Sequence, residues 1–133
     1  MSLLLTIDFE TGDTSAFSST FGSPVVSGTT PIQGAYSLLT TGNAHATIDL
    51  PGGGVDDLYT LHDIQYSAAP TGTRNILAVR SSSGEIASIR VQSDEKARVQ
   101  LGGSVLFTTT GTVGTGDLPL SLRVKRNSQV PVN

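Results

Sequence analysis

Hydrophobic and polar residues alternate repeatedly along this chain, and the alternation predicts most of its structure. Leu3, Leu5, Ile7 and Phe9 alternate with polar residues up to position 10, which predicts a first strand over 3–10. The segments 44–50 and 118–125 alternate in the same way. No segment keeps a helical period for three turns, so the pattern indicates an all-β protein.

The other strands follow from apolar runs that are bounded by turn residues. Segment 58–67 is apolar on both sides, which predicts a central strand or a bulge near His62 and Asp63. Four short strands are expected over 75–80, 85–92, 97–101 and 105–109, with loops at 51–57, 70–74 and 111–117. These roughly nine strands predict a single domain over 1–133, an antiparallel β-sandwich of two packed sheets. Its expected core contains Phe9, Ile48, Ile89, Val91, Leu120 and Leu122.

Composition narrows the function classes. The chain has 133 residues, 15 glycines and only 14% charged residues, which suits one domain of short strands and tight turns. It has no cysteine, so disulfides, thiolate nucleophiles and cysteine zinc sites are excluded. The net charge of −3 argues against nucleic acid as a partner. No segment is long and apolar enough to predict a membrane span.

Charge is unevenly divided along the chain. Seven acids and no base precede Arg74, while all eight bases and four acids lie from Arg74 onward, so the two parts carry −7 and +4. One interpretation is that strands from both parts share sheets and their charges offset each other. The other is a bipolar surface that orients neighbouring subunits head to tail.

The opening residues resemble a known family. Phe9-Glu10-Thr11-Gly12-Asp13, then Phe17, the Gly-Ala-Tyr-Ser-Leu run at 34–38 and the strand at 44–50 are similar to the start of concanavalin A-like lectin and glucanase (laminin-G-like) jelly-roll domains. The resemblance implies a jelly-roll topology. It also implies that the fold continues past a strand such as 118–125, so the chain is expected to be a short or C-terminally truncated version. Because this architecture carries enzymes, lectins and structural modules alike, it does not choose among them.

Catalytic constellations are missing, and we expect no enzymatic activity. Asp8 and Glu10 share a strand face at a spacing that any i, i+2 pair has, and the alternating acids of a glucanase strand are absent. There is no nucleophile elbow. His62 and Asp63 are adjacent in a predicted strand and therefore point to opposite faces. No catalytic residue and no organic cofactor is predicted.

The acids at the opening turn have two interpretations. The first is a turn with Gly12 at positive φ and Asp13 capping it. The second is a structural calcium held by oxygens of Glu10, Gly12 and Asp13, since calcium takes carboxylate and carbonyl ligands. The turn is the favoured interpretation.

Two functions remain. The first is a virion-type assembly component, such as a bacteriophage capsid decoration (cement) protein or fibre part, because a Cys-free, Trp-free, Ser/Thr/Gly-rich domain without a predicted signal peptide suits a particle built in the host cytoplasm. The alternative is an extracellular lectin-like module, in which polar loops would bind a glycan. The expected partner is protein, either copies of the chain or a particle lattice.

Six positions are predicted to contact a partner or ligand. Leu4 is an apolar residue on the polar side of its strand, and Val130 and Val132 belong to an apolar end with no pairing strand. The polar loops contribute Asp56, Asp57 and Asp117.

Overall fold

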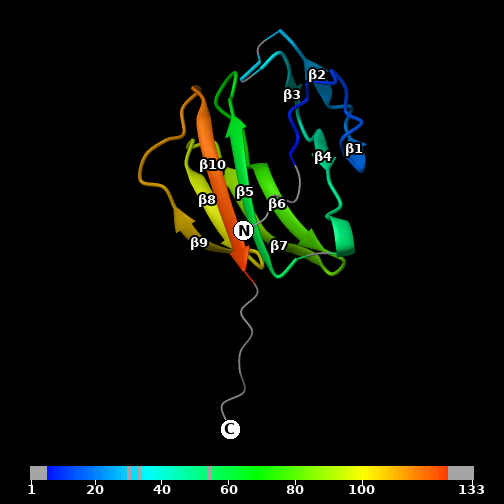
Figure 1. Ribbon diagram of the computed structural model, residues 1–133. Coiled ribbons are helices and arrows are strands. Elements are labelled where there is room, and N and C mark those ends of the chain that lie inside the picture. Colours follow the sequence, from blue (N-terminus) through cyan, green and yellow to red (C-terminus); the bar gives the residue numbers. More distant parts are fainter. Residues whose placement is uncertain (1–5, 30, 33, 54, 126–133) are drawn as a thin grey trace. The chain divides into compact units, whose positions relative to one another are not determined.

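A computed structural model describes residues 6–29, 31–32, 34–53 and 55–125 of this chain (Figure 1). The described residues form ten strands and one short 3-10 turn, Pro51–Gly53, and contain no α-helix. All strand pairs are antiparallel. The all-β prediction is confirmed, and the several antiparallel sheets are compatible with a β-sandwich. The chain forms two compact units, Met1–Val55 and Asp56–Asn133, called unit 1 and unit 2 below.

Unit 1 contains two pairs of three-residue strands. β1 (Ser19–Phe21) pairs with β4 (His45–Thr47), and β2 (Val25–Ser27) pairs with β3 (Ser37–Leu39). Gly22 follows β1; its φ is +69°, and a Cβ there would lie 2.8 Å from the Cα of Ala44. Only glycine allows this close approach of two main chains. The strand predicted over 44–50 is therefore present, but it is shorter than expected.

The first strand predicted over 3–10 is wrong over its described part. Residues 6–9 belong to no strand, and Phe9 has a φ of +59°. The Gly12 N–H donates to the Phe9 carbonyl (2.9 Å), and the Glu10 N–H donates to the Asp8 carboxylate (3.2 Å). These local hydrogen bonds satisfy the main chain in a turn, so the segment does not need a partner strand.

The first and last described strands of unit 2 form a two-stranded ribbon. β5 (Asp57–Ile64) pairs with β10 (Leu118–Lys125) over their full lengths, and the two strands lie side by side in Figure 1. Along β10 half-buried and exposed residues alternate strictly, as the sequence predicts. The pairing has no register shift, so the bulge expected near His62 is absent. β5 pairs with β10 alone among the described strands, and it is therefore not the central strand that its apolar sequence suggested.

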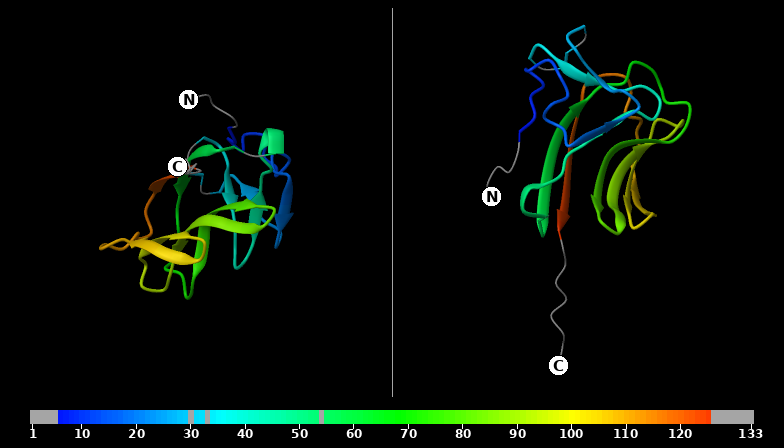
Figure 2. Two further views of the ribbon diagram at one scale, coloured as in Figure 1. Left: turned by 90° about the horizontal axis from the view of Figure 1, so that it is seen from below. Right: turned by 90° about the vertical axis from the view of Figure 1, so that its right-hand side faces the viewer.

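A four-stranded meander forms the rest of unit 2. Its order is β6 (Arg74–Ser81), β7 (Gly84–Val91), β8 (Ala97–Leu101) and β9 (Ser104–Thr108). The right-hand view of Figure 2 shows this curved sheet and the β5–β10 ribbon as two layers of the unit. The predicted meander is confirmed, and each strand has the expected position to within about two residues.

The core of unit 2 lies along β7 and the start of β8. Ala87, Ile89, Val91 and Ala97 are its buried hydrophobic residues. Ile89 and Val91 confirm the predicted core. The other four predicted core residues are only half-buried; they are Phe9, Ile48, Leu120 and Leu122.

We expect Ile89→Ala to lower the free energy of unfolding by about 3 kcal/mol, because it leaves a cavity in the closed part of the core. Ile86→Ala in the same strand is the matched control, since Ile86 is 38% exposed and Ile89 only 4%. The control should cost less than about 1 kcal/mol. Urea unfolding followed by circular dichroism measures both, and equal losses would contradict this placement of the core.

Candidate functional site

The opening acids form a closed turn in unit 1. The Glu10 carboxylate accepts a hydrogen bond from the Ala35 main-chain N–H at 3.1 Å. Gly34 before it has a φ of +67°, and a Cβ there would collide with Glu10 Oε1. Glu10 therefore joins two segments that are 25 positions apart.

Asp13 caps the same turn. Its Oδ1 accepts hydrogen bonds from the Ser15 hydroxyl (2.5 Å), the Ser15 main-chain N–H (3.0 Å) and the Thr11 hydroxyl (3.1 Å). These donors, the Ser15 hydroxyl first, lower the pKa of Asp13. Gly12 has a φ of +75°, so the turn interpretation of this segment is confirmed.

Calcium at Glu10, Gly12 and Asp13 stays a prediction. Within residues 6–29, 31–32, 34–53 and 55–125, no group of three His, Cys, Asp or Glu side chains is placed to hold a metal ion. Glu10 and Asp13 already accept hydrogen bonds from the protein, and these bonds account for their positions without a cation.

Replacing Gly34 should show how much the Glu10 contact contributes. Gly42→Ala is the matched control, because Gly42 has a similar φ (+61°) but a Cβ there would meet nothing within 4 Å. Both variants incur the cost of a positive φ, about 1 kcal/mol, and only Gly34→Ala displaces the Glu10 carboxylate. We expect Gly34→Ala to have the lower midpoint in thermal unfolding. Equal midpoints would mean that the Glu10 contact does not stabilise unit 1.

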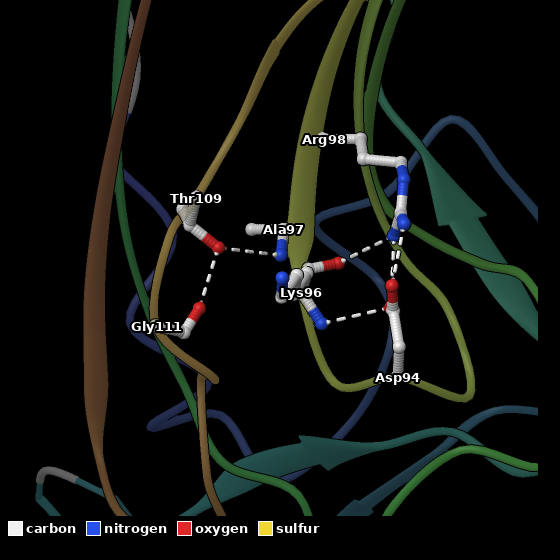
Figure 3. Close-up of polar contacts among 6 residues, drawn as sticks. All are labelled: Asp94, Lys96, Ala97, Arg98, Thr109 and Gly111. Carbon is white, nitrogen blue, oxygen red and sulfur yellow. Dashed lines mark hydrogen bonds and ion pairs between the residues drawn. The ribbon is translucent and has the colours of Figure 1, made fainter.

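A polar network fixes the hairpin between β7 and β8 in unit 2 (Figure 3). Both Asp94 carboxylate oxygens accept hydrogen bonds from the Arg98 guanidinium, at 2.9 and 2.6 Å. Asp94 also accepts from the Lys96 main-chain N–H at 3.1 Å. The two-pronged pair holds the turn against the first residues of β8.

The same hairpin binds the loop that follows β9. The Ala97 N–H donates to the Thr109 hydroxyl (3.1 Å), which donates to the Gly111 carbonyl (2.7 Å), as Figure 3 shows. The Val113 N–H donates to the Glu95 carbonyl (2.8 Å). Hydrogen bonds to the hairpin thus hold the first half of the loop predicted over 111–117.

Asp94 makes the hairpin sensitive to acid. Hydrogen bonds from Arg98, then from the Lys96 N–H, hold the pKa of Asp94 well below its usual range. Because the folded pKa is the lower one, the stabilisation is fully present above about pH 4, the ordinary aspartate pKa, and is lost as the pH falls through the folded pKa.

We therefore expect Asp94→Asn to destabilise the protein at pH 7 and to match the parent increasingly as the pH falls below about 4. Asp117→Asn is the control, because Asp117 is exposed and has no ion pair among the described residues. Urea unfolding at a series of pH values measures this. A difference between Asp94→Asn and the parent that stays constant down to about pH 2 would contradict the assignment.

The predicted contact residues do not meet at one place. Asp57 begins β5, where its carboxylate pairs with Arg123 at 2.8 and 2.5 Å, and this hydrogen bonding lowers the pKa of Asp57. Asp56 is exposed beside it, whereas Asp117 immediately precedes β10 at the other end of the ribbon, roughly 26 Å away along the strands. The remaining three predicted positions, Leu4, Val130 and Val132, lie outside the described residues.

An apolar surface on the edge strand β9 was not predicted. Val105, Leu106 and Phe107 are 51%, 64% and 59% exposed. Leu101 and Ile86 are also exposed and lie at the hairpin before β9. Leu101 pairs with Ser104, and the Gly102 N–H donates to the Ile86 carbonyl. We call these five residues the β9 surface. The glycine pair at 102–103 indicates the hairpin before β9. The sequence does not show that β9 is an edge strand among the described strands.

Comparisons give this chain no relative from which to take a function. No family model, no curated protein and no solved structure matches it. Among the described residues no helix is long and apolar enough to cross a membrane. The functional argument therefore rests on the surfaces of the two units.

Proposed function

We propose that this protein is a non-enzymatic structural component that functions in contact with protein, first of all with its own copies. The observation that carries the proposal is the β9 surface, where three successive apolar residues are exposed on the edge of a sheet. Apolar residues exposed along the edge of a sheet are typical of sites that a protein partner covers. Natural edge strands normally carry charges or proline instead, and β9 has neither.

The particle that suits such a component is a virion. A capsid decoration (cement) protein or a fibre part of a bacteriophage is repeated many times, so each copy needs only a modest apolar contact. A jelly-roll topology of the concanavalin A-like kind belongs to this proposal, since the resemblance of the opening residues supports it. Virion localisation follows from the same reasoning.

A lectin-like module is the second candidate, and one observation favours it. Tyr59 is 48% exposed on the outer face of the β5–β10 ribbon, directly opposite Arg123 in the register. Sugar rings stack on exposed aromatic side chains, and an arginine–carboxylate pair beside the ring offers hydrogen bonds to hydroxyl groups. A glycan array tests this candidate: specific binding that is lost in Tyr59→Ala would replace the assembly proposal.

Sedimentation velocity tests the assembly proposal directly. We expect the protein to form larger species as its concentration rises, and the double variant Val105→Lys/Phe107→Lys to remain monomeric, because two charges are then placed on the β9 surface. Leu61→Lys is the control, since Leu61 is 70% exposed but lies on β5, away from β9. A parent protein that stays monomeric at every concentration would overturn self-assembly.

A further inference from the structure

A mostly apolar cavity that is partly open to solvent lies within unit 2, between β10 and strands β7, β8 and β9, and Gln100 is a polar residue of its lining. Its volume is about 220 Å³. Six apolar residues line it: Ala87, Val99, Leu101, Leu106, Leu122 and Val124. An apolar cavity of ~150 Å³ is already large enough to bind benzene in another protein. This one therefore has room for at least one large apolar side chain.

The cavity reaches the main chain of β10. Its wall contains four successive residues of that strand, Leu122 to Lys125. Successive side chains of a strand point to opposite faces, so a wall of four in succession includes backbone. Among the described strands β10 pairs only with β5, which leaves its second edge without a partner strand. A free edge next to an apolar cavity is the arrangement that accepts an added strand.

The outer face of β10 carries positive charge beside the cavity. Arg123 and Lys125 are exposed there, and the residues that line the cavity include no acid. Asp57 forms a two-pronged pair with Arg123 and also lies opposite Lys125 in the register, so one carboxylate faces two cations. Asp56 and Asp57 match the two cations in number, but both acids lie at the start of β5, so the charges on β10 itself, next to its second edge, are positive and complement an acidic partner.

The free edge of β9 is a poorer template than that of β10. Val99 pairs with Phe107 and Gln100 with Val105, so Leu106 is the extra residue of a bulge. A bulge bends an edge strand and interrupts regular pairing. Leu106 lines the cavity instead, and β10 keeps an unbroken register.

We propose that the free edge of β10 and the cavity bind an extended strand of a partner protein in which apolar residues alternate with acidic ones. The added strand pairs with β10, its apolar side chains enter the cavity beside Leu106 and Val124, and its acidic side chains meet Arg123 and Lys125 on the opposite face. The inference rests on the proposed function, because it gives the chemistry of the partner segment.

Binding of synthetic peptides tests it on the whole chain. The probe is a fluorescent peptide of about ten residues that alternates valine and glutamate; the comparison peptides alternate valine and lysine, or carry the valines and glutamates in two blocks. Fluorescence anisotropy should show saturable binding of the alternating valine–glutamate peptide, at least about tenfold tighter than that of either comparison peptide.

Two variants locate the site. Leu106→Gln should weaken binding about tenfold, whereas Leu61→Gln, equally polar and at a similarly exposed position on the far face of β5, should leave it unchanged. Lys125→Glu should shift the preference towards the valine–lysine peptide. If Leu106→Gln also prevents self-association, the strand comes from a second copy, which supports the proposal.

The inference is overturned if the alternating valine–glutamate peptide does not bind, or if it binds without regard to charge and to Leu106→Gln. A different result would contradict the proposed function: the parent protein would sediment as a monomer at every concentration. Self-association that continues in Leu106→Gln, with no peptide bound, would leave assembly standing and remove only the β10 site.

Discussion

Strand β7 is the constraint on which unit 2 depends, because it is paired on both edges and has more buried residues than any other described strand. It hydrogen-bonds to β6 on one side and to β8 on the other. Ala87, Ile89 and Val91 are buried on one face, and Ser88 is fully buried on the other. The Ser88 hydroxyl accepts a hydrogen bond from Arg90 Nε (3.2 Å), and Arg90 also pairs with Glu85 at 2.8 Å. Its burial is tolerated because this network replaces water.

Side-chain burial decreases from β7 through β8 to β9. β8 still has buried residues at Ala97 and Gln100, but the side-chain oxygen of Gln100 has no hydrogen-bond partner among the described residues. β9 has no buried residue at all, and its bulge turns Leu106 to the cavity instead of to a further strand. Among the described residues, those at the centre of the sheet are thus buried and hydrogen-bonded, whereas those toward β9 are exposed or lack a hydrogen-bond partner. An edge of this kind gains more from a partner than a closed edge would, which is why both proposals concern the same side of unit 2.

Sequence predicted the strands of unit 2 well, because their two faces meet different surroundings. In β10 the alternation is strict and the strand has the predicted bounds. Prediction failed where a side chain bonds to nearby main chain: Asp8 stabilises a turn at a place where alternation indicated a strand. The sequence also did not predict the exposed β9 surface, since exposure at a sheet edge depends on the order of strands, which local pattern does not contain. For the candidate site, Asp57 was found from sequence, but its partner Arg123, 66 positions away, could not be.

The pairing of Asp57 with Arg123 supports, within unit 2, the first of the two interpretations of the uneven charge. Asp57 belongs to the acidic first part of the sequence and Arg123 to the basic second part, yet they lie on paired strands of one ribbon. Part of the −7/+4 division is therefore neutralised inside unit 2, as the first interpretation expected. Counted by unit, residues 1–55 keep four acids and no base, while residues 56–133 hold seven acids against eight bases. Glu85, Asp94 and Asp57 each pair with an arginine, and Lys125 at the end of β10 lies outside these pairs. An acidic strand beside β10 would meet Lys125 without breaking one of these ion pairs, whereas a basic strand would meet the like charges of Arg123 and Lys125.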